Sequence, residues 1–239
     1  MTNYTNWNGF KLLETELMGR LVKIVFPNCT PNGKIVIKTE YFEDFPNTQI
    51  ALVEKGYHLC YIANQTRWFA PGDDDAKAAL VDYMAQNYGT QKKAALIGMS
   101  CGGLQAVYFA SAYPEYVSCM HLDAPVINLL SCPGGLGKRN DGMMAEFTNH
   151  TGMTLTELIS YRNHPYDHIP ELIKNRIPVI LIAGDSDMSV PFEENGIYLK
   201  KAYEKTEIPF KFIMKPGCGH HPHGLENPKE IVDFIEENY

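Results

Sequence analysis

The chain has 239 residues, of which 45% are hydrophobic, and it carries a formal net charge of −7. That length and apolar content are enough to bury the core of one α/β domain. The acidic balance and the dispersed lysines and arginines exclude the basic stripe of a nucleic-acid-binding protein, and no apolar run reaches membrane-spanning length.

The expected elements begin with strands. Residues 10–16 and 19–26 predict a β-hairpin, and residues 34–38 predict a third strand. Elements then alternate in the order helix 47–55, strand 58–62, helix 73–87, strand 94–99, helix 101–112 and strand 118–123. Such alternation predicts a parallel sheet. The nearly unbroken apolar runs 94–98 and 178–183 are typical of central strands covered by helices on both faces.

The alternation stops after the sixth strand. Between residues 125 and 176 the chain contains a Pro-Gly-Gly loop and two helical stretches, near 143–150 and 155–161. We interpret about 126–176 as a small cap segment within a single domain that covers residues 1–239. The chain then resumes with strand 178–183, helix 192–205, strand 209–214 and helix 228–237, which complete a mostly parallel sheet.

The N-terminus and the cysteines indicate the compartment. The first residues have neither the charged nor the apolar region of a signal peptide, and the six cysteines are scattered singly. This spacing favours neither a disulfide framework nor a CxxC metal site. We therefore expect a cytoplasmic protein with reduced thiols and no membrane partner.

The segment 98–102, Gly-Met-Ser-Cys-Gly, lies where an apolar strand meets a helix rich in small residues. A serine on such a tight turn needs neighbours without side chains, so that the helix can pack on the strand while Oγ projects above the sheet edge. The helix N-terminus adds a partial positive charge, and the Cys101 backbone N–H can point at an oxyanion. The pattern predicts that Ser100 is a nucleophile.

A serine hydroxyl needs a base, and that base needs an orienting acid. Asp187 directly follows the strand 178–183, and His220 follows the last strand. Parallel strands bring their carboxyl ends to one edge of a sheet, so these side chains can meet Ser100 there. The chain order Ser, Asp, His is that of hydrolases with this kind of turn.

Two other aspartates are alternatives for the acid. Asp123 ends the sixth strand, and Asp185 lies two residues before Asp187. A hydrogen-bonded turn is the commoner role for such residues, so Asp187 ranks first and Asp123 second.

These features together resemble the α/β-hydrolase superfamily. The resemblance rests on the turn around Ser100, on Gly-x-x-Asp-x-x-Val-Pro at 184–191 and on Gly-His at 219–220, and it covers the chain from Lys34 onward. It implies the α/β-hydrolase fold, with Asp187 as the acid and His220 as the base. The segments 39–42, 123–125 and 219–223 also resemble a bacterial group often encoded beside carbohydrate-degrading enzymes, which implies removal of acyl groups from sugars.

Loops at the same sheet edge are candidates for the rest of the site. By analogy with the superfamily, the second oxyanion donor comes from the loop after the third strand, and we assign it to the Glu40 backbone. Arg67 and Trp68 follow the fourth strand and are candidate substrate-binding residues. Trp68 has two interpretations, stacking on a sugar or aryl group and anchoring its own loop.

Neither a metal nor a cofactor is expected. His221 and His223 stand beside His220, but no HExxH helix or matched carboxylate cluster accompanies them. The loop with Lys138 and Arg139 lacks the frame of a phosphate-binding loop, although these two residues could meet an anionic substrate.

The combined prediction is a serine esterase that acts on a small-molecule ester through an acyl-enzyme. Peptide, thioester or lactone hydrolysis on the same triad is the first alternative, and the absence of a propeller pattern disfavours an oligopeptidase. A non-catalytic hydrolase fold that binds a ligand is the second. A homo-oligomer is left open.

Overall fold

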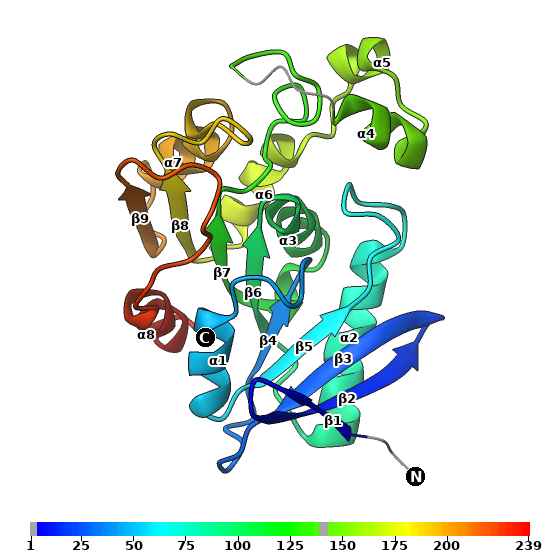
Figure 1. Cartoon of the computed structure of the whole chain (residues 1–239), viewed down its shortest axis with the longest axis vertical. Helices are drawn as coiled ribbons and strands as arrows, with labels where there is room; N and C mark the ends of the chain where they lie inside the picture. Colours follow the sequence, from blue (N-terminus) through cyan, green and yellow to red (C-terminus); the bar gives the residue numbers. More distant parts are fainter. Residues whose placement is uncertain (1–3, 139–142) are drawn as a thin grey trace.

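A nine-stranded β-sheet runs through the computed structural model, which describes residues 4–138 and 143–239 (Figure 1). Its strands are β1 (Tyr4–Trp7), β2 (Phe10–Leu17), β3 (Arg20–Phe26), β4 (Ile35–Lys38), β5 (His58–Ile62), β6 (Ala94–Met99), β7 (Val117–Asp123), β8 (Val179–Gly184) and β9 (Phe210–Lys215). The helices are α1 (Asn47–Glu54), α2 (Asp73–Tyr88), α3 (Cys101–Ala112), α4 (Met144–Thr151), α5 (Leu155–Ser160), α6 (Ile169–Lys174), α7 (Gly196–Tyr203) and α8 (Lys229–Glu237).

The sheet order is β1-β2-β3-β5-β4-β6-β7-β8-β9. Strands β1, β2, β3 and β5 pair antiparallel, whereas every pair from β5 through β4 to β9 is parallel. The expected parallel sheet is therefore confirmed, and the carboxyl ends of β4, β6, β7 and β8 meet at one edge.

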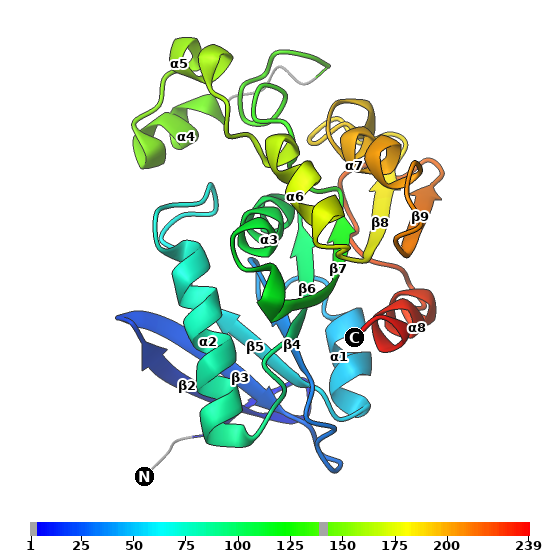
Figure 2. The same cartoon turned by 180° about the vertical axis from the view of Figure 1, so that it is seen from behind.

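Helices cover both faces of this sheet (Figures 1 and 2). Buried apolar side chains form two hydrophobic clusters, one on each face of the sheet. Helices α2, α3, α6 and α7 pack on the larger cluster, and helices α1 and α8 pack on the smaller one, on the other face. Strands β6, β7 and β8 are buried along their whole length, as their apolar runs predict. In α8 the buried residues Ile231, Val232, Phe234 and Ile235 form one stripe against α1.

Three elements differ from the expectations. Strand β1 was not expected, because only Trp7 of its four residues is buried and the segment shows no apolar alternation. Helix α6 was also missed, since six residues are too few to show a helical period. The expected helix 192–205 is a 3₁₀ turn at Phe192–Glu194 followed by α7.

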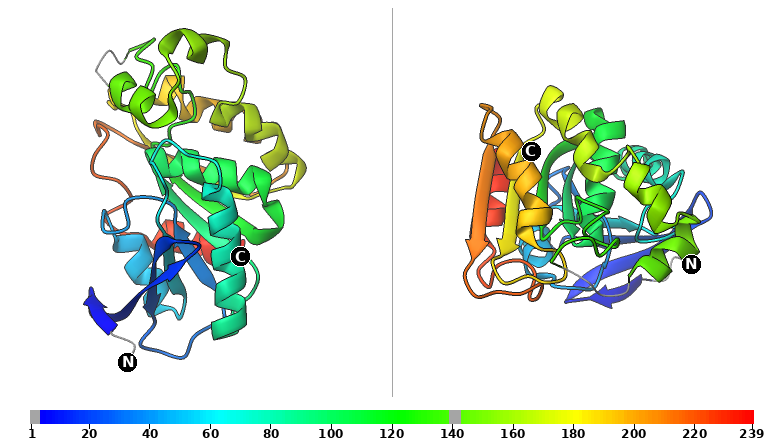
Figure 3. Two further views of the ribbon diagram at one scale, coloured as in Figure 1. Left: turned by 90° about the vertical axis from the view of Figure 1, so that its right-hand side faces the viewer. Right: turned by 90° about the horizontal axis from the view of Figure 1, so that it is seen from above.

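Helices α4 and α5 stand above the carboxyl ends of the central strands (Figure 3). They lie in the expected cap, 126–176, of which residues 139–142 with Arg139 are outside the described residues. Helix α6, in the same segment, instead packs on α3 beside the sheet. That the chain is one domain with this cap stays a prediction. Within the described residues, no helix has the length and apolarity needed to span a membrane.

Candidate active site

Ser100 lies on a strained turn between β6 and α3. Its φ of 52° and ψ of −121° place a non-glycine residue in a sparsely populated backbone region. The turn is fixed by hydrogen bonds from the Ser100 amide to the Asp123 carbonyl (3.0 Å) and from the Val126 amide to the Ser100 carbonyl (3.0 Å). A Cβ at Gly98 would lie 2.6 Å from the Gly102 carbonyl oxygen, so the close packing of strand on helix requires glycine.

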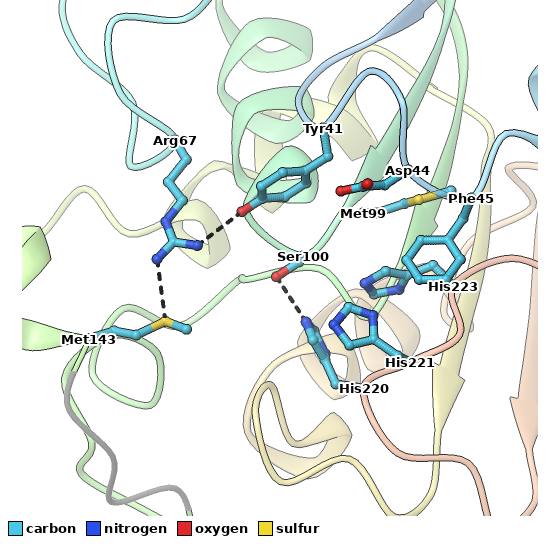
Figure 4. Close-up of a pocket in the computed structure, with 10 residues that line it drawn as sticks. All are labelled: Tyr41, Asp44, Phe45, Arg67, Met99, Ser100, Met143, His220, His221 and His223. Carbon is cyan, nitrogen blue, oxygen red and sulfur yellow. Dashed lines mark hydrogen bonds between the residues drawn. The ribbon is translucent and has the colours of Figure 1, made fainter.

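His220 connects Ser100 with Asp187. Its Nε2 lies 3.1 Å from Ser100 Oγ (Figure 4). Its Nδ1 lies 2.7 Å from Asp187 Oδ2. An ionised carboxylate only accepts hydrogen bonds, so Nδ1 carries the proton and Nε2 can accept the Ser100 hydroxyl. The three predicted residues thus meet at one point, in the arrangement needed to deprotonate a serine.

Asp187 is held as a carboxylate. Its Oδ1 accepts hydrogen bonds from the backbone amides of Ser189 (2.7 Å) and Val190 (2.8 Å). Burial acts to raise the pKa of Asp187, but the hydrogen bond and charge of His220 and the two amides outweigh it, so the pKa is lowered. The carboxylate can therefore orient His220 and stabilise its protonated form.

The two alternative aspartates contact other groups. Asp123 is fully buried and accepts hydrogen bonds from His223 Nδ1 (3.0 Å), the Gly224 amide (2.5 Å) and Lys215 Nζ (3.4 Å). Burial would raise the pKa of Asp123, but His223 and Lys215 lower it. Asp185 accepts from the Gly217 amide (2.8 Å). Both aspartates hold the loop that carries His220, and neither has a hydrogen bond to the imidazole among the described residues.

The loop after β4 presents Tyr41 to Ser100. Tyr41 has a positive φ of 54° and lines the pocket above Ser100, whereas Glu40 does not line it. The Glu40 carboxylate turns away and accepts a hydrogen bond from Asn64 Nδ2 (2.7 Å). The oxyanion amide at Glu40 stays a prediction, and the neighbouring Tyr41 amide, at a positive-φ turn beside the pocket, is a second candidate. Among the described residues, the Tyr41 amide makes one hydrogen bond, a long one of 3.4 Å to Glu40 Oε1.

The pocket above Ser100 has a volume of about 220 Å³. The predicted residues Ser100, His220 and Arg67 line it, and Trp68 does not. Residues that the sequence analysis did not place there complete the wall: Tyr41, Asp44, Phe45, Met99, Met143, His221 and His223 (Figure 4). Met143 belongs to the cap, which therefore borders the pocket.

Trp68 anchors the cap rather than facing the pocket. Its side chain is buried, its Nε1 donates to Glu146 Oε1 on α4 (3.0 Å), and its ring packs edge-on against Phe147. Arg67 forms a two-point ion pair with the same Glu146 carboxylate. The Trp68 side chain therefore anchors the cap as well as its own loop. Its stacking on a substrate is not supported.

A buried lysine ties the surrounding loops together. Lys77 Nζ donates to Asn64 Oδ1 (2.5 Å), to Gln105 Oε1 on α3 (3.0 Å) and to the Asp73 carbonyl (3.0 Å). Asn64 Nδ2 in turn donates to the Thr39 carbonyl (2.7 Å). Burial lowers the pKa of Lys77 to about 8, with Asp73 opposing. The network holds the loop before Tyr41 against the helix that follows Ser100.

Three comparisons place this architecture among known proteins. The model of the prolyl oligopeptidase family matches residues 65–239. The chain belongs to the prolyl oligopeptidase family. This membership, together with the sheet described above, confirms the expected α/β-hydrolase fold.

Within this family, the chain is similar to larger proteins. Acylamino-acid-releasing enzymes of Rattus norvegicus and Mus musculus are each 25% identical over 150 residues, which is 61% of this chain and 20% of theirs. The chain therefore spans about a fifth of the length of the curated relatives it matches.

Solved structures share the fold at low sequence identity. Est1E from Butyrivibrio proteoclasticus has a TM-score of 0.64 at 19% identity, over 99% of this chain and 96% of that one. Acylaminoacyl peptidase of Pyrococcus horikoshii scores 0.72 at 12% identity, over 99% and 41% of the two chains. A bifunctional GH43-CE protein of Bacteroides eggerthii scores 0.72 at 19% identity, over 94% and 37%.

Proposed function

We propose that the protein is a serine esterase that removes short acyl groups from a small-molecule ester, with a carbohydrate as the preferred alcohol. The observation that carries the proposal is the chain of contacts from Ser100 Oγ through His220 to Asp187 at the floor of a pocket. In this proposal Ser100 is the nucleophile, His220 the general base and Asp187 the orienting acid.

The reaction then proceeds in two halves. His220 Nε2 accepts the Ser100 proton while Oγ bonds to the carbonyl carbon of the ester. The amides of Cys101, at the N-terminus of α3, and Tyr41 stabilise the oxyanion. His220 returns the proton to the alcohol as the C–O bond breaks, and the acyl group stays on Ser100. Water attacks the acyl-enzyme with His220 again as base, which releases the acid and restores the serine.

Two findings support an ester with a short acyl group. The pocket of about 220 Å³ lies below the range of drug-sized binding sites, so it suits a small acyl group. Nearly the full length of Est1E matches this chain, and the GH43-CE protein shares the fold.

We also place the protein in the reducing cytoplasm, because the exposed thiol of Cys29 suits that compartment.

Hydrolysis of an acylated amino acid or peptide is the second candidate. It is favoured by membership of the prolyl oligopeptidase family and by the match to acylamino-acid-releasing enzymes. Amides and esters pass through the same oxyanion, so the triad itself serves both reactions.

A substrate panel separates the two candidates. Acetylated monosaccharides, p-nitrophenyl acetate, p-nitrophenyl octanoate and N-acetyl-alanine p-nitroanilide are compared by kcat/KM in the wild type, with Ser100→Ala as the blank. We expect the highest values for the acetyl esters, at least tenfold above the octanoate and the anilide. A higher kcat/KM for the anilide would establish the peptidase candidate instead.

A further inference from the structure

Three histidines gather on one wall of the pocket. His220, His221 and His223 each offer a nitrogen, and these ligand atoms all lie within 4.8 Å of one another. Their ring centroids are 4.8 to 4.9 Å apart in every pair. All three rings line the pocket above Ser100 (Figure 4).

Two of the histidines are oriented as metal ligands usually are. His220 Nδ1 contacts Asp187 Oδ2 (2.7 Å), and His223 Nδ1 contacts Asp123 Oδ1 (3.0 Å). A carboxylate behind Nδ1 fixes the tautomer, leaves the Nε2 lone pair free to bind and raises its basicity. The sequence predicted Asp187 beside His220 but did not indicate Asp123 beside His223, because Asp123 ends a distant strand and meets that histidine only in the fold.

His221 lies on the solvent-exposed side of the three-histidine cluster. Its ring is exposed and stacks on Phe45 at a centroid distance of 5.4 Å. Among the described residues the His221 ring makes no hydrogen bond, so a turn toward the other two rings breaks its stacking on Phe45 and no polar contact.

We propose that His220, His221 and His223 form an inhibitory site for a divalent transition-metal ion, with Zn²⁺ as the type case. Three imidazole nitrogens and a water complete a tetrahedral zinc sphere, with Zn–N distances of about 2.0–2.1 Å. Nitrogens on a tetrahedral zinc ion lie about 3.3 Å apart, so the widest nitrogen separation has to shorten by about 1.5 Å to reach that geometry. The ion occupies the Nε2 lone pair of His220, so the Ser100 proton has no acceptor and hydrolysis stops.

The inhibition rests on the proposed role of His220, whereas binding of the ion does not. Binding is therefore measured on Ser100→Ala, by calorimetry with ZnCl₂ and by the visible spectrum of the Co²⁺ complex. We expect one ion per chain and the intense visible bands of tetrahedral Co²⁺ with nitrogen ligands. In the wild type, ZnCl₂ reduces acetyl-ester hydrolysis and slows labelling by a fluorophosphonate, and EDTA restores both.

Matched variants identify the ligands. His221→Gln and His223→Gln each raise the inhibitory ZnCl₂ concentration by about tenfold or more, relative to the activity of the same variant without zinc. His150→Gln, an exposed histidine on α4, leaves zinc sensitivity unchanged. A half-exposed cysteine, Cys218, lies nearby. If Cys218→Ser abolishes inhibition, or if Co²⁺ gives thiolate charge-transfer bands, the histidine site is wrong.

The two proposals fail separately. A Co²⁺ complex without hydrolysis of any ester or amide would leave the metal site standing and overturn the esterase. Full hydrolysis with no Zn²⁺ binding to Ser100→Ala would overturn only the metal site.

Discussion

Asp187 and Asp123 are two buried carboxylates that follow or end neighbouring strands. Each one contacts a histidine, and these two histidines, His220 and His223, are three residues apart in the sequence. The two aspartates differ in the imidazole that they contact. Asp187 contacts His220, which contacts Ser100, whereas Asp123 contacts His223. In our account the first orients the base and the second fixes the loop that carries it.

Isosteric variants of the two aspartates therefore have different effects. Asp187→Asn places an amide against His220 and favours the wrong tautomer, so kcat for p-nitrophenyl acetate falls by about 10⁴. Asp123→Asn leaves kcat within about tenfold of the wild type, since the triad is intact. A larger loss of kcat in Asp123→Asn would move the acid to Asp123.

The Asp123 contacts also make stability depend on pH. Its pKa in the folded state is lowered, so its ion pairs contribute fully above the ordinary pKa of 3.8 and are lost as the pH falls through the folded value. Asp123→Asn should cost about 3 kcal/mol of unfolding free energy at pH 7, with a smaller difference at pH 3. Urea titrations at several pH values measure this, with Glu115→Gln, at an exposed carboxylate, as control. A cost that does not change with pH would refute the assignment.

Sequence patterns identified Asp187 and His220 as the partners of Ser100 because the spacing of glycines and the order of Asp and His follow from the chemistry. They predicted the oxyanion amide at Glu40 and did not indicate Tyr41 as a second candidate, since the positive φ at Tyr41 has no local signature in a non-glycine residue. They also left Trp68 open, because its partner Glu146 comes from the cap, far along the chain.

At the scale of elements, polar side chains couple the loop after β4, the loop after β5 and helix α2. Asn64, after β5, bonds to the Thr39 carbonyl and to the Glu40 carboxylate, and Lys77 on α2 holds Asn64. The loop that presents Tyr41 is thus supported from behind.

Asn64 is accordingly a positioning residue. Asn64→Ala should lower kcat for acetyl esters by roughly tenfold with little change in KM, because the displaced loop amide acts on the oxyanion and not on the bound substrate. Affinity for a boronic acid, which mimics the tetrahedral adduct, should fall by a similar factor. Gln65→Ala, on the exposed side of the same loop, is the control. A purely structural role would lower stability and leave the boronic acid affinity unchanged.

The longer helices and the central strands could be predicted because local sequence patterns indicate them. The central strands, for example, are nearly unbroken apolar runs. The crossover that places β5 outside β4, the edge strand β1 and the short α6 could not be predicted, because each depends on contacts between distant segments.

Over the whole molecule, α4 of the cap is tied to the loop between β5 and α2 at Glu146. Its carboxylate binds Arg67 and the Trp68 indole, both on the loop between β5 and α2. The cap borders the pocket through Met143, so its attachment shapes the site.

Glu146→Gln removes the ion pair and should loosen α4 without unfolding the sheet. We expect limited proteolysis within 126–176 to be several-fold faster and KM for acetyl esters to rise several-fold, while thermal unfolding remains one transition. Glu171→Gln on α6 serves as the control. Unchanged proteolysis and KM would show that Glu146 does not hold the cap.

The central claim is that Ser100 is a nucleophile activated by His220 and Asp187. The most direct measurement is covalent labelling of the folded protein by a fluorophosphonate, located by mass spectrometry. We predict one adduct per chain on Ser100, absent in Ser100→Ala and much slower in His220→Gln. Folded wild-type protein that stays unlabelled, or an adduct on another residue, would contradict the account.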